Sequence, residues 1–414
     1  MKTCSISKTV TLIMASTAIV FGTVLSGWAT TFKVLHQFAG NQDGEVPSWG
    51  VTEDSSRNLF GTAYGGGQFQ GGVVFELSPN QDGTWSETVV YNFDFNSNVG
   101  SMPATGVVLD HDGNLYGSTV SGGPNDSGTA FELSPIGGGW TIEVLYEKNG
   151  AARMILDSIG NLYGPLGPGD YLGGAIGKLS PAPGEWNYTA LHSFCQTPGC
   201  KDGILPLSPL AWDAAGNLYG TTLEGGIYQP GYGVAYQLRP RADGTWAYHI
   251  LHWFSAFVGD AVLPNGGMVV DSKGNVYGSS GVGGPTFTGT VFKLSPQPPG
   301  QWGQSVGYSE TQLYTFPDCA QGCGPENPLV MDKAGNLYGT AGGGSTSCGG
   351  FYCGVVFRLS PRRDGTWKYV VLRKFSGSDG ESPAGVIVDA NGNLFGTTRG
   401  GGQYNKGVIF EITP

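Results

Sequence analysis

Charge is scarce in this chain of 414 residues, and positive charge is the scarcer kind. Only 13% of the residues are charged, with 21 Lys and Arg against 32 Asp and Glu. Long apolar runs are absent after residue 29, whereas a membrane helix needs about 20 apolar residues. An acidic surface also repels nucleic acid and anionic lipid. The composition therefore excludes a nucleic-acid partner and a later membrane span, and it favours a neutral or cationic partner.

Motifs for nucleotide and metal chemistry are missing as well. The glycine cluster at 164–169 is not followed by the Lys-Ser/Thr pair of a phosphate loop. The "DHDGN" stretch at 110–114 lacks the later glutamate and the helices of an EF-hand. His36, His192 and His252 share one register, Leu-His-x-Phe, that Tyr or Arg fills in other copies. We interpret these histidines as packing residues with a polar tip rather than as metal ligands, and no Ser-His-acid triad stands out.

The N-terminus has the pattern of a secretory signal. Two lysines precede an uncharged run from Thr9 to Leu25, and small residues follow at Gly27 and Ala29. We interpret residues 1–29 as a cleaved bacterial signal, so that the mature chain is extracellular with a net charge of −13. The alternative is an uncleaved anchor, because the run of 17 residues is at the short end of a membrane span.

Glycine, by contrast, is abundant, and a glycine motif repeats along the chain. There are 72 Gly residues, and 39% of the chain is apolar in short runs punctuated by glycine, which indicates an all-β fold. An Asn-aliphatic-aromatic-Gly motif, as in "GNLYGTT" at 216–222, recurs at steps of 47 to 61 residues. Its seven copies begin at Asn58, Asn114, Asn161, Asn217, Asn275, Asn336 and Asn393. A regular period of this kind is typical of a solenoid or a propeller.

Each period holds four strand-like runs, A to D. Run A ends in aspartate, and run B is the glycine motif. Run C resembles "VVFELSP" (73–79), and run D starts beside a tryptophan, as in "TWSETVVYNF" (84–93). Apolar residues fall on both sides of many runs, which suits sheets covered on both faces. Four short antiparallel strands per period are typical of a propeller blade.

The two chain ends predict a closed ring. Runs A, B and C each occur seven times, but the chain stops after the last run C, "IFEITP" (409–414). The missing run D is at the other end, as "TFKVLHQF" (31–38). An open solenoid gives no reason for this complementarity, whereas closure removes exposed edges. We therefore predict an all-β, seven-bladed β-propeller at residues 30–414, monomeric, in which the N-terminal strand joins the C-terminal three.

The repeated unit also carries a family resemblance. "GNLYGTT" followed by Gly-Gly and then by Gly-Val-x-Phe-x-Leu-Ser-Pro resembles the GloVer tandem-repeat family of secreted bacterial β-propeller-like proteins, across residues 30–414. The resemblance implies an extracellular repeat protein without an assigned activity, and it carries over no catalytic residue. This chain ends without the C-terminal sorting signal of many such proteins, so no surface anchor is expected.

The glycine motif itself is interpreted as a turn. In every copy it follows the aspartate that ends run A, and six of the seven links carry Gly before Asn. Asp-x-x-Gly-Asn is typical of a tight hairpin turn. In the first copy Arg57 replaces the glycine.

Six cysteines remain after signal cleavage, in three close pairs. An even number in a secreted chain favours disulfides. We predict a bond between Cys195 and Cys200, and bonds among the other four cysteines with their connectivity left open: Cys319, Cys323, Cys348 and Cys353. Zinc bound by these four is the alternative, although their spacings are not those of zinc knuckles. All six lie in loops from D to A or from B to C, which share one propeller face.

That face is the expected binding surface. The B-to-C loops are the longest and most varied, and loops on a rigid scaffold commonly carry binding sites. Their aromatic residues suit a glycan or a protein ligand, although they could instead cap the blade ends. The candidate ligand-binding residues are Tyr64, Tyr228, Tyr232, Tyr352 and Tyr404.

A second set of candidates is a recurring aspartate before run A. It occurs at Asp43, Asp202, Asp260 and Asp379. We expect these carboxylates at the mouth of the central channel, where they would hold calcium or a cationic group of a ligand. The alternative is a turn preference for Asp-Gly. No other cofactor is expected.

These features together favour a secreted binding or scaffold module that recognises a glycan or a protein. The alternative is an extracellular polysaccharide lyase or hydrolase whose site lies at the central channel.

Overall fold

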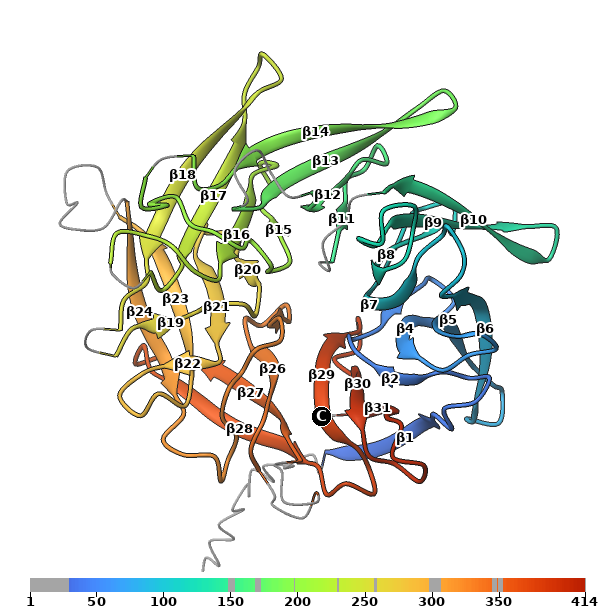
Figure 1. Ribbon diagram of the computed structural model, residues 1–414. Helices are drawn as coiled ribbons and strands as arrows, with labels where there is room; N and C mark the ends of the chain where they lie inside the picture. Colours follow the sequence, from blue (N-terminus) through green and yellow to red (C-terminus); the bar gives the residue numbers. More distant parts are fainter. Residues whose placement is uncertain are drawn as a thin grey trace, which may run out of the picture.

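The structure is a computed structural model, and its strands form a ring of blades around a central axis (Figure 1). It describes residues 30–147, 153–167, 173–196, 198–228, 231–256, 259–297, 307–344, 348 and 353–413. The predicted signal at residues 1–29 and the candidate Tyr352 lie outside the described residues. The described residues contain no helix, and so none that could cross a membrane.

The described strands confirm the prediction of seven antiparallel blades. In each blade the strands follow one another from the innermost, A, to the outermost, D. Blade 1 contains β2 (Glu45–Pro47) and β3 (Thr52–Glu53), which share the innermost position, then β4 (Leu59–Gly65), β5 (Gln70–Pro79) and β6 (Trp85–Asp94). Blade 2 contains β7 (Ser101–Leu109), β8 (Leu115–Ser121), β9 (Ala130–Ile136) and β10 (Gly139–Tyr146). Blade 3 contains β11 (Ile155–Leu156), β12 (Leu162–Pro165), β13 (Ala175–Ala182) and β14 (Glu185–Ser193).

The second half of the ring repeats this order. Blade 4 contains β15 (Ala211–Trp212), β16 (Leu218–Thr222), β17 (Val234–Pro240) and β18 (Trp246–Trp253). Blade 5 contains β20 (Met268–Val270), β21 (Val276–Ser280), β23 (Thr290–Pro296) and β24 (Tyr308–Thr315), with the small extra pair β19 (Ala261–Val262) and β22 (Val282–Gly283). Blade 6 contains β25 (Val330–Met331), β26 (Leu337–Ala341), β27 (Val355–Pro361) and β28 (Trp367–Lys374). Blade 7 contains β29 (Glu381–Val388), β30 (Leu394–Gly400), β31 (Val408–Thr413) and β1 (Thr31–Gln37).

Blade 7 closes the ring as predicted. The N-terminal strand β1 pairs antiparallel with the C-terminal strand β31, from Thr31 opposite Thr413 to Gln37 opposite Val408. Figure 1 shows the two strands side by side, in the colours of opposite chain ends. Both ends of the chain are thus held in one sheet, and the D strand of the last blade comes from the first strand of the fold.

The recurring glycine of strand B is required by packing within the blade. A methyl group on Gly61 would lie 2.5 Å from the ring of Phe75 on strand C, which is closer than carbon atoms approach. Phe75 is fully buried, and the same Gly-Phe contact recurs between Gly278 and Phe292. In these blades the aromatic ring of strand C therefore fits only because strand B has no side chain at this position.

The Asp-x-x-Gly-Asn segments form the predicted turns. In blade 4 the carboxylate of Asp213 accepts hydrogen bonds from the backbone N–H groups of Ala215 and Asn217 and from the Asn217 side chain. The Tyr219 hydroxyl donates a further bond of 3.0 Å to the same carboxylate. Side chain–backbone bonds of this kind stabilise tight turns. Phe60 and Phe395 replace this tyrosine in blades 1 and 7.

Arg57 fills the turn position that is glycine elsewhere, and its backbone has a φ of 71°. Its guanidinium lies 3.5 Å from the carboxylate of Asp389, the turn aspartate of blade 7. The arginine at this turn therefore adds an ion pair between blades 1 and 7.

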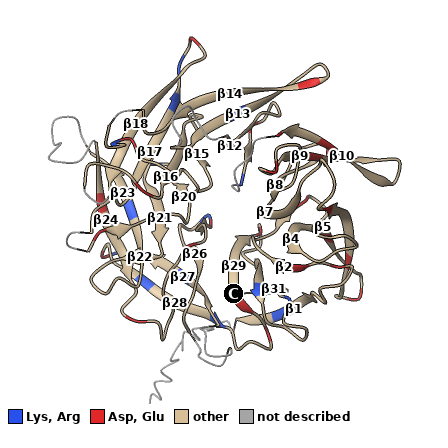
Figure 2. Cartoon of the chain, viewed as in Figure 1, with Lys and Arg blue, Asp and Glu red and all other residues tan. Residues whose placement is uncertain are grey.

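Figure 2 shows Lys and Arg few and scattered around the ring, with acidic residues distributed among them. The basic residues of the described chain therefore do not gather in one segment of the ribbon in this view.

Candidate functional site

A β-bulge on every D strand determines where the candidate aspartates bind. In blade 7 the register with strand C shifts between Val34 and His36, so that Leu35 is the extra residue. The equivalent shift occurs on the D strand of each of the other blades. A bulge re-aims the side chain next to it. The residue after the bulge, here called the rim position, is His36, Tyr91, Tyr146, His192, His252, Tyr314 or Arg373.

The four candidate aspartates bind the rim position of the D strand before them. We expected their carboxylates at the mouth of the channel, but each lies against this outer strand. The pairs are His36 with Asp43 at 3.4 Å, His192 with Asp202 at 3.2 Å, His252 with Asp260 at 3.2 Å, and Arg373 with Asp379. Each carboxylate also accepts the backbone N–H three residues after the rim position, from Ala39, Cys195, Ser255 and Ser376. Both bonds fasten the D-to-A loop to the blade that precedes it.

The sequence contains a signal for this pairing that our prediction missed. The aspartate occurs in the four loops whose rim position is His or Arg, and it is absent where the rim position is Tyr. An aspartate before run A is thus present wherever the rim position carries a cationic or protonatable side chain. This covariation indicates an ion pair within each junction rather than a shared ring of ligands.

The rim position of one blade also contacts the D strand of the next blade. The partner, here called the facing position, lies four residues before the next rim position. Aromatic pairs stack at three junctions: Tyr146 with Tyr188 at 4.8 Å, His192 with Tyr248 at 3.9 Å, and Tyr314 with Tyr369 at 4.1 Å. Arg373 lies 3.9 Å above the ring of Phe32, a cation–π contact. His252 instead meets a carboxylate, that of Glu310, at 3.2 Å.

The junction of blades 7 and 1 carries the same residue types as the His252 junction. Glu87 occupies the facing position there, opposite His36 and Asp43. Burial, and to a lesser extent the charge of Asp43, raise the pKa of Glu87 to about 7. Burial lowers the pKa of His36, although Asp43 acts to raise it. Among the described residues, Glu87 Oε1 is buried without a hydrogen-bond partner, so that a charged Glu87 is poorly compensated.

We expect Glu87→Gln to stabilise the protein by about 1 kcal/mol above pH 7, after allowance for partial exposure. The folded-state pKa lies above the ordinary value of 4.5, so the folded protein keeps a proton that the unfolded chain releases between about pH 4.5 and 7. The stability contributed by Glu87 therefore falls as the pH rises through this interval. Urea unfolding from pH 4 to 8 should show no advantage of the variant near pH 4 and a constant advantage above pH 7. An advantage that is equal at all pH values would contradict this assignment.

The candidate tyrosines are spread over several blades of the loop-rich face. Tyr404 is 50% exposed. Tyr64 and Tyr228 are half-buried. Tyr232 is also half-buried and packs against the core between blades 4 and 5. The structure therefore does not bring these side chains into one cluster, and only Tyr232 lines one of the pockets described next.

A pocket of about 480 Å³ opens on the loop-rich face at blade 4. It is lined by Cys200, Ile204, Glu224, Tyr232 and Leu263 together with four glycines. Backbone bonds between Ile204 and Glu224 tie its two loops together, at 2.9 and 3.2 Å. The pocket is thus part of a rigid frame that combines a carboxylate, a phenol and backbone groups.

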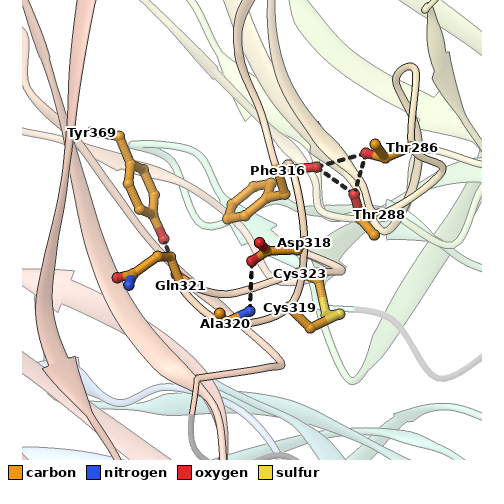
Figure 3. The surroundings of a disulfide bond; sticks show 9 residues. All are labelled: Thr286, Thr288, Phe316, Asp318, Cys319, Ala320, Gln321, Cys323 and Tyr369. Carbon is orange, nitrogen blue, oxygen red and sulfur yellow. Dashed lines mark hydrogen bonds between the residues drawn. A yellow bond between two sulfur atoms is a disulfide. The ribbon is translucent and has the colours of Figure 1, made fainter.

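The disulfides fasten the loops of the same face. The bonds join Cys195 to Cys200, as predicted, and Cys319 to Cys323 and Cys348 to Cys353, which gives the pairing that the sequence left open. In blades 4 and 6 the tyrosine at the facing position holds the bridged loop of the blade before it. Tyr248 donates to the carbonyl of Asp202, and Tyr369 donates to that of Gln321, both at 2.6 Å. Figure 3 shows the second of these bonds beside the disulfide of Cys319 and Cys323.

A second pocket, of about 460 Å³, lies beside the A-to-B turns of blades 3 and 4. Tyr163, Trp212 and Trp246 line it, and the Tyr163 ring packs edge-on against both indoles. Trp212 precedes the turn aspartate, where the other blades carry no aromatic residue. Sequence reasoning missed this pocket because it searched the opposite face.

The inner wall of the ring carries one unexpected cation. The position four residues before each turn aspartate is Gly50, Gly106, Arg153, Pro209, Gly267, Pro328 or Gly385. Neighbouring positions of this set approach one another, as at Gly50 with Gly385 and at Gly267 with Pro209. Arg153 alone has a long side chain there, and burial lowers its pKa. Its guanidinium donates to Thr52 Oγ1 of blade 1 at 3.3 Å, and it forms no ion pair with a described carboxylate.

The fold and the junction contacts define a tandem-repeat β-propeller. Within this class, the chain belongs to the Gloeobacter/Verrucomicrobia repeat family, whose model matches residues 17–164 and 208–414. This confirms the resemblance drawn from the repeats. A comparison with curated proteins finds no match.

Solved structures with a similar arrangement include several enzymes. An ulvan lyase bound to -[GlcA(1-4)Rha3S]- has a TM-score of 0.53 at 10% identity, with 91% of this chain and 95% of that chain covered. An ancestral GH74 enzyme has a TM-score of 0.51 at 11% identity, with 88% of this chain and 48% of that chain covered. At such identities the likeness shows the propeller fold alone.

Proposed function

We propose that the protein is an extracellular, non-catalytic module that binds a neutral glycan in the blade 4 pocket of the loop-rich face. The observation that carries the proposal is the pocket itself, lined by Glu224 and Tyr232 and framed by the bridged loop of Cys200. Its volume of about 480 Å³ falls in the range of small-molecule sites. The three disulfides fit an oxidising, extracellular location.

The pocket has the properties that a sugar ring requires. Glu224 offers a carboxylate that accepts from hydroxyl groups, and Tyr232 offers an aromatic ring with a polar end. The carbonyl of Cys200 accepts the N–H groups of Gly203 and Gly226, at 2.9 and 3.0 Å, so the wall is held in place before a ligand arrives. A preorganised wall lowers the entropic cost of binding. The acidic chain favours a neutral ligand over an acidic one.

The recurring carboxylates support binding rather than catalysis. All seven turn aspartates accept hydrogen bonds from their own turn, and all four aspartates before run A accept a hydrogen bond from the backbone N–H three residues after the rim position. Each is therefore occupied by a structural contact. A general acid or base must instead be able to reach a substrate proton.

We expect Glu224→Gln combined with Tyr232→Phe to weaken binding about 10-fold or more, because a charged acceptor becomes neutral and a hydroxyl group is lost while the shape is kept. A glycan array of neutral and acidic plant and microbial oligosaccharides identifies the probe, and titration calorimetry then measures its affinity. Tyr404→Phe, on the same face but outside the pocket, is the matched control. Unchanged affinity in the double variant would remove the blade 4 pocket as the site. If glycan affinity falls in Trp212→Phe but not in the double variant, the binding site is the pocket on the opposite face.

The second candidate function is a polysaccharide lyase or hydrolase at the central channel, and Arg153 is the observation that favours it. An arginine without a carboxylate partner in the described wall suits a carboxylate or sulfate group of a substrate. Release of reducing or unsaturated ends from uronate-containing and neutral polysaccharides distinguishes the two functions. Release that is abolished in Arg153→Lys would favour the enzyme, because lysine keeps the charge but lacks the planar fork.

A further inference from the structure

Three side chains from two blades meet at the outer edge of the junction between blades 4 and 5. His252 belongs to β18, Asp260 to the loop after it, and Glu310 to β24 of the next blade. His252 Nε2 lies 3.2 Å from Asp260 Oδ2 and 3.2 Å from Glu310 Oε2. The three side chains are 17%, 11% and 12% exposed. Nitrogen and oxygen donors thus converge in a largely buried place.

We propose that His252, Asp260 and Glu310 form a zinc site that cross-links blades 4 and 5. This inference is independent of the proposed glycan site. It differs from the calcium expectation, which rested on four aspartates gathered at the channel. In the structure each of those aspartates lies against its own rim position, and among the described residues Asp260 alone belongs to a group of three such ligands whose atoms all lie within 4.8 Å of one another.

The distances from the His252 nitrogen to the carboxylate oxygens match zinc. Zinc bonds to His nitrogen and carboxylate oxygen are about 2.0–2.2 Å long, so two ligands of a tetrahedral ion lie about 3.3 Å apart. The distances from His252 Nε2 to the two oxygens of Asp260 are 3.2 and 3.4 Å, and that to Glu310 is 3.2 Å. Three protein ligands leave the fourth position to water. Calcium takes six to eight oxygen ligands, and the imidazole nitrogen does not suit it.

The charge of the site also calls for a divalent ion. Two ionised carboxylates carry a charge of −2, of which the imidazole compensates one unit when it is protonated and none when it is neutral, and burial makes uncompensated charge costly. Asp260 is fixed in place because its Oδ2 accepts from the Ser255 N–H and hydroxyl, at 2.8 and 3.2 Å. Glu310 Oε1, in contrast, is buried without a hydrogen-bond partner among the described residues. A divalent cation would balance both carboxylates.

The other histidine junctions provide internal comparisons. At the junction of blades 3 and 4, His192 and Asp202 have the same pairing, but Tyr248 takes the place of the third ligand. At the junction of blades 7 and 1, Glu87 occupies the position that corresponds to Glu310, so that a histidine, an aspartate and a glutamate are again present. Nevertheless, the His252 group is the one set of three such side chains in the described chain whose ligand atoms all lie within 4.8 Å. The sequence alone did not reveal the site because its ligands come from different blades.

The test uses the mature chain, residues 30–414, after treatment with a chelator. Titration calorimetry with ZnCl₂ should give one site of micromolar affinity or tighter, and zinc at 100 times Kd should raise Tm by about 3 °C. CaCl₂ should give no such shift. Glu310→Gln should weaken zinc binding at least 10-fold, whereas Glu87→Gln, the matched change at the other junction, should leave it unchanged.

A cobalt titration provides a readout that does not depend on stability. Co²⁺ at the site should give the intense visible absorption of a four-coordinate ion, and Glu310→Gln should abolish it. Equal zinc affinity in the native chain and in Glu310→Gln would assign the binding to other side chains. No zinc binding in the folded chain would leave the three residues as an ion-pair cluster alone. Either result overturns the proposal.

Discussion

A chain lacking residues 30–38 should fail to form a soluble, monomeric propeller. Deletion removes all of β1 and exposes the hydrogen-bonding edge of β31 from Val408 to Thr413. It also removes Phe38, which is fully buried and packs edge-on against Phe75 of blade 1 at 5.2 Å. Loss of one buried phenylalanine side chain costs about 3–5 kcal/mol, and whole domains are stable by only about 5–15 kcal/mol. The loss of the entire strand should therefore exceed the stability of the fold.

Size-exclusion chromatography and thermal unfolding measure this outcome against the chain that begins at residue 30. The truncated chain should aggregate, because an exposed strand edge pairs with other molecules. A synthetic peptide of residues 30–38, added during refolding, should recover part of the monomer by filling the vacant edge. A truncated chain that remains monomeric with an unchanged Tm would show that β1 does not close the ring.

The fold was predictable because the strands and turns of each repeat are marked by short sequence motifs. The missing D run at the C-terminus and the extra one at residues 31–38 are visible in the sequence, and their pairing follows from strand geometry. The Asp-x-x-Gly-Asn turn is equally local, since its donors and its acceptor lie within seven residues, as between Asp213 and Tyr219. Both predictions, the closure of the ring and the turn, could therefore be made from the pattern of repeats in the sequence.

The contacts between rim and facing positions were not predictable in the same way, because they join different blades. Tyr146 and Tyr188, or His252 and Glu310, are separated by about one repeat and meet only after the bulge has turned the rim position toward its neighbour. We expected Asp202 and Asp260 at the channel because their loops lead to the innermost strand. The ion pairs with His192 and His252 hold both carboxylates at the outer strand instead. Each D-to-A loop runs toward the innermost strand, but its aspartate side chain contacts the outermost strand.

Asp213→Ala should lower the free energy of unfolding by about 2–3 kcal/mol. The substitution removes a carboxylate that accepts four hydrogen bonds, and it leaves the Tyr219 hydroxyl, on a side chain only 2% exposed, without this acceptor. Unsatisfied buried polar groups cost about 1–3 kcal/mol each. Tyr219→Phe removes the bond to Asp213 and the bond that the hydroxyl accepts from Gln237 Nε2, but it keeps the carboxylate and its turn. It should cost about 1–2 kcal/mol, and phenylalanine occurs naturally at this position in blades 1 and 7.

The pH dependence of this effect has a definite sign. Burial alone would raise the pKa of Asp213, but hydrogen bonds from Asn217, Tyr219 and Ala215 outweigh it, so that the pKa is lowered. A lowered pKa contributes stability above the ordinary value of 3.8 that is lost as the pH falls through the folded-state pKa. The difference in the free energy of unfolding between the native chain and Asp213→Ala should therefore have its largest value at pH 7 and decrease below about pH 4.

Urea unfolding of Asp213→Ala at pH 7 and at pH 3 measures both the size and the sign of this effect. Asp243→Ala is the matched control. Asp243 lies in the turn between β17 and β18, is fully exposed, and accepts hydrogen bonds from the Thr245 N–H and hydroxyl. We expect the control to change Tm little at either pH. Equal losses in the two variants would mean that the repeated turn contributes no more than an ordinary surface turn. The conserved spacing of its aspartate and asparagine across seven blades would then need an explanation other than stability.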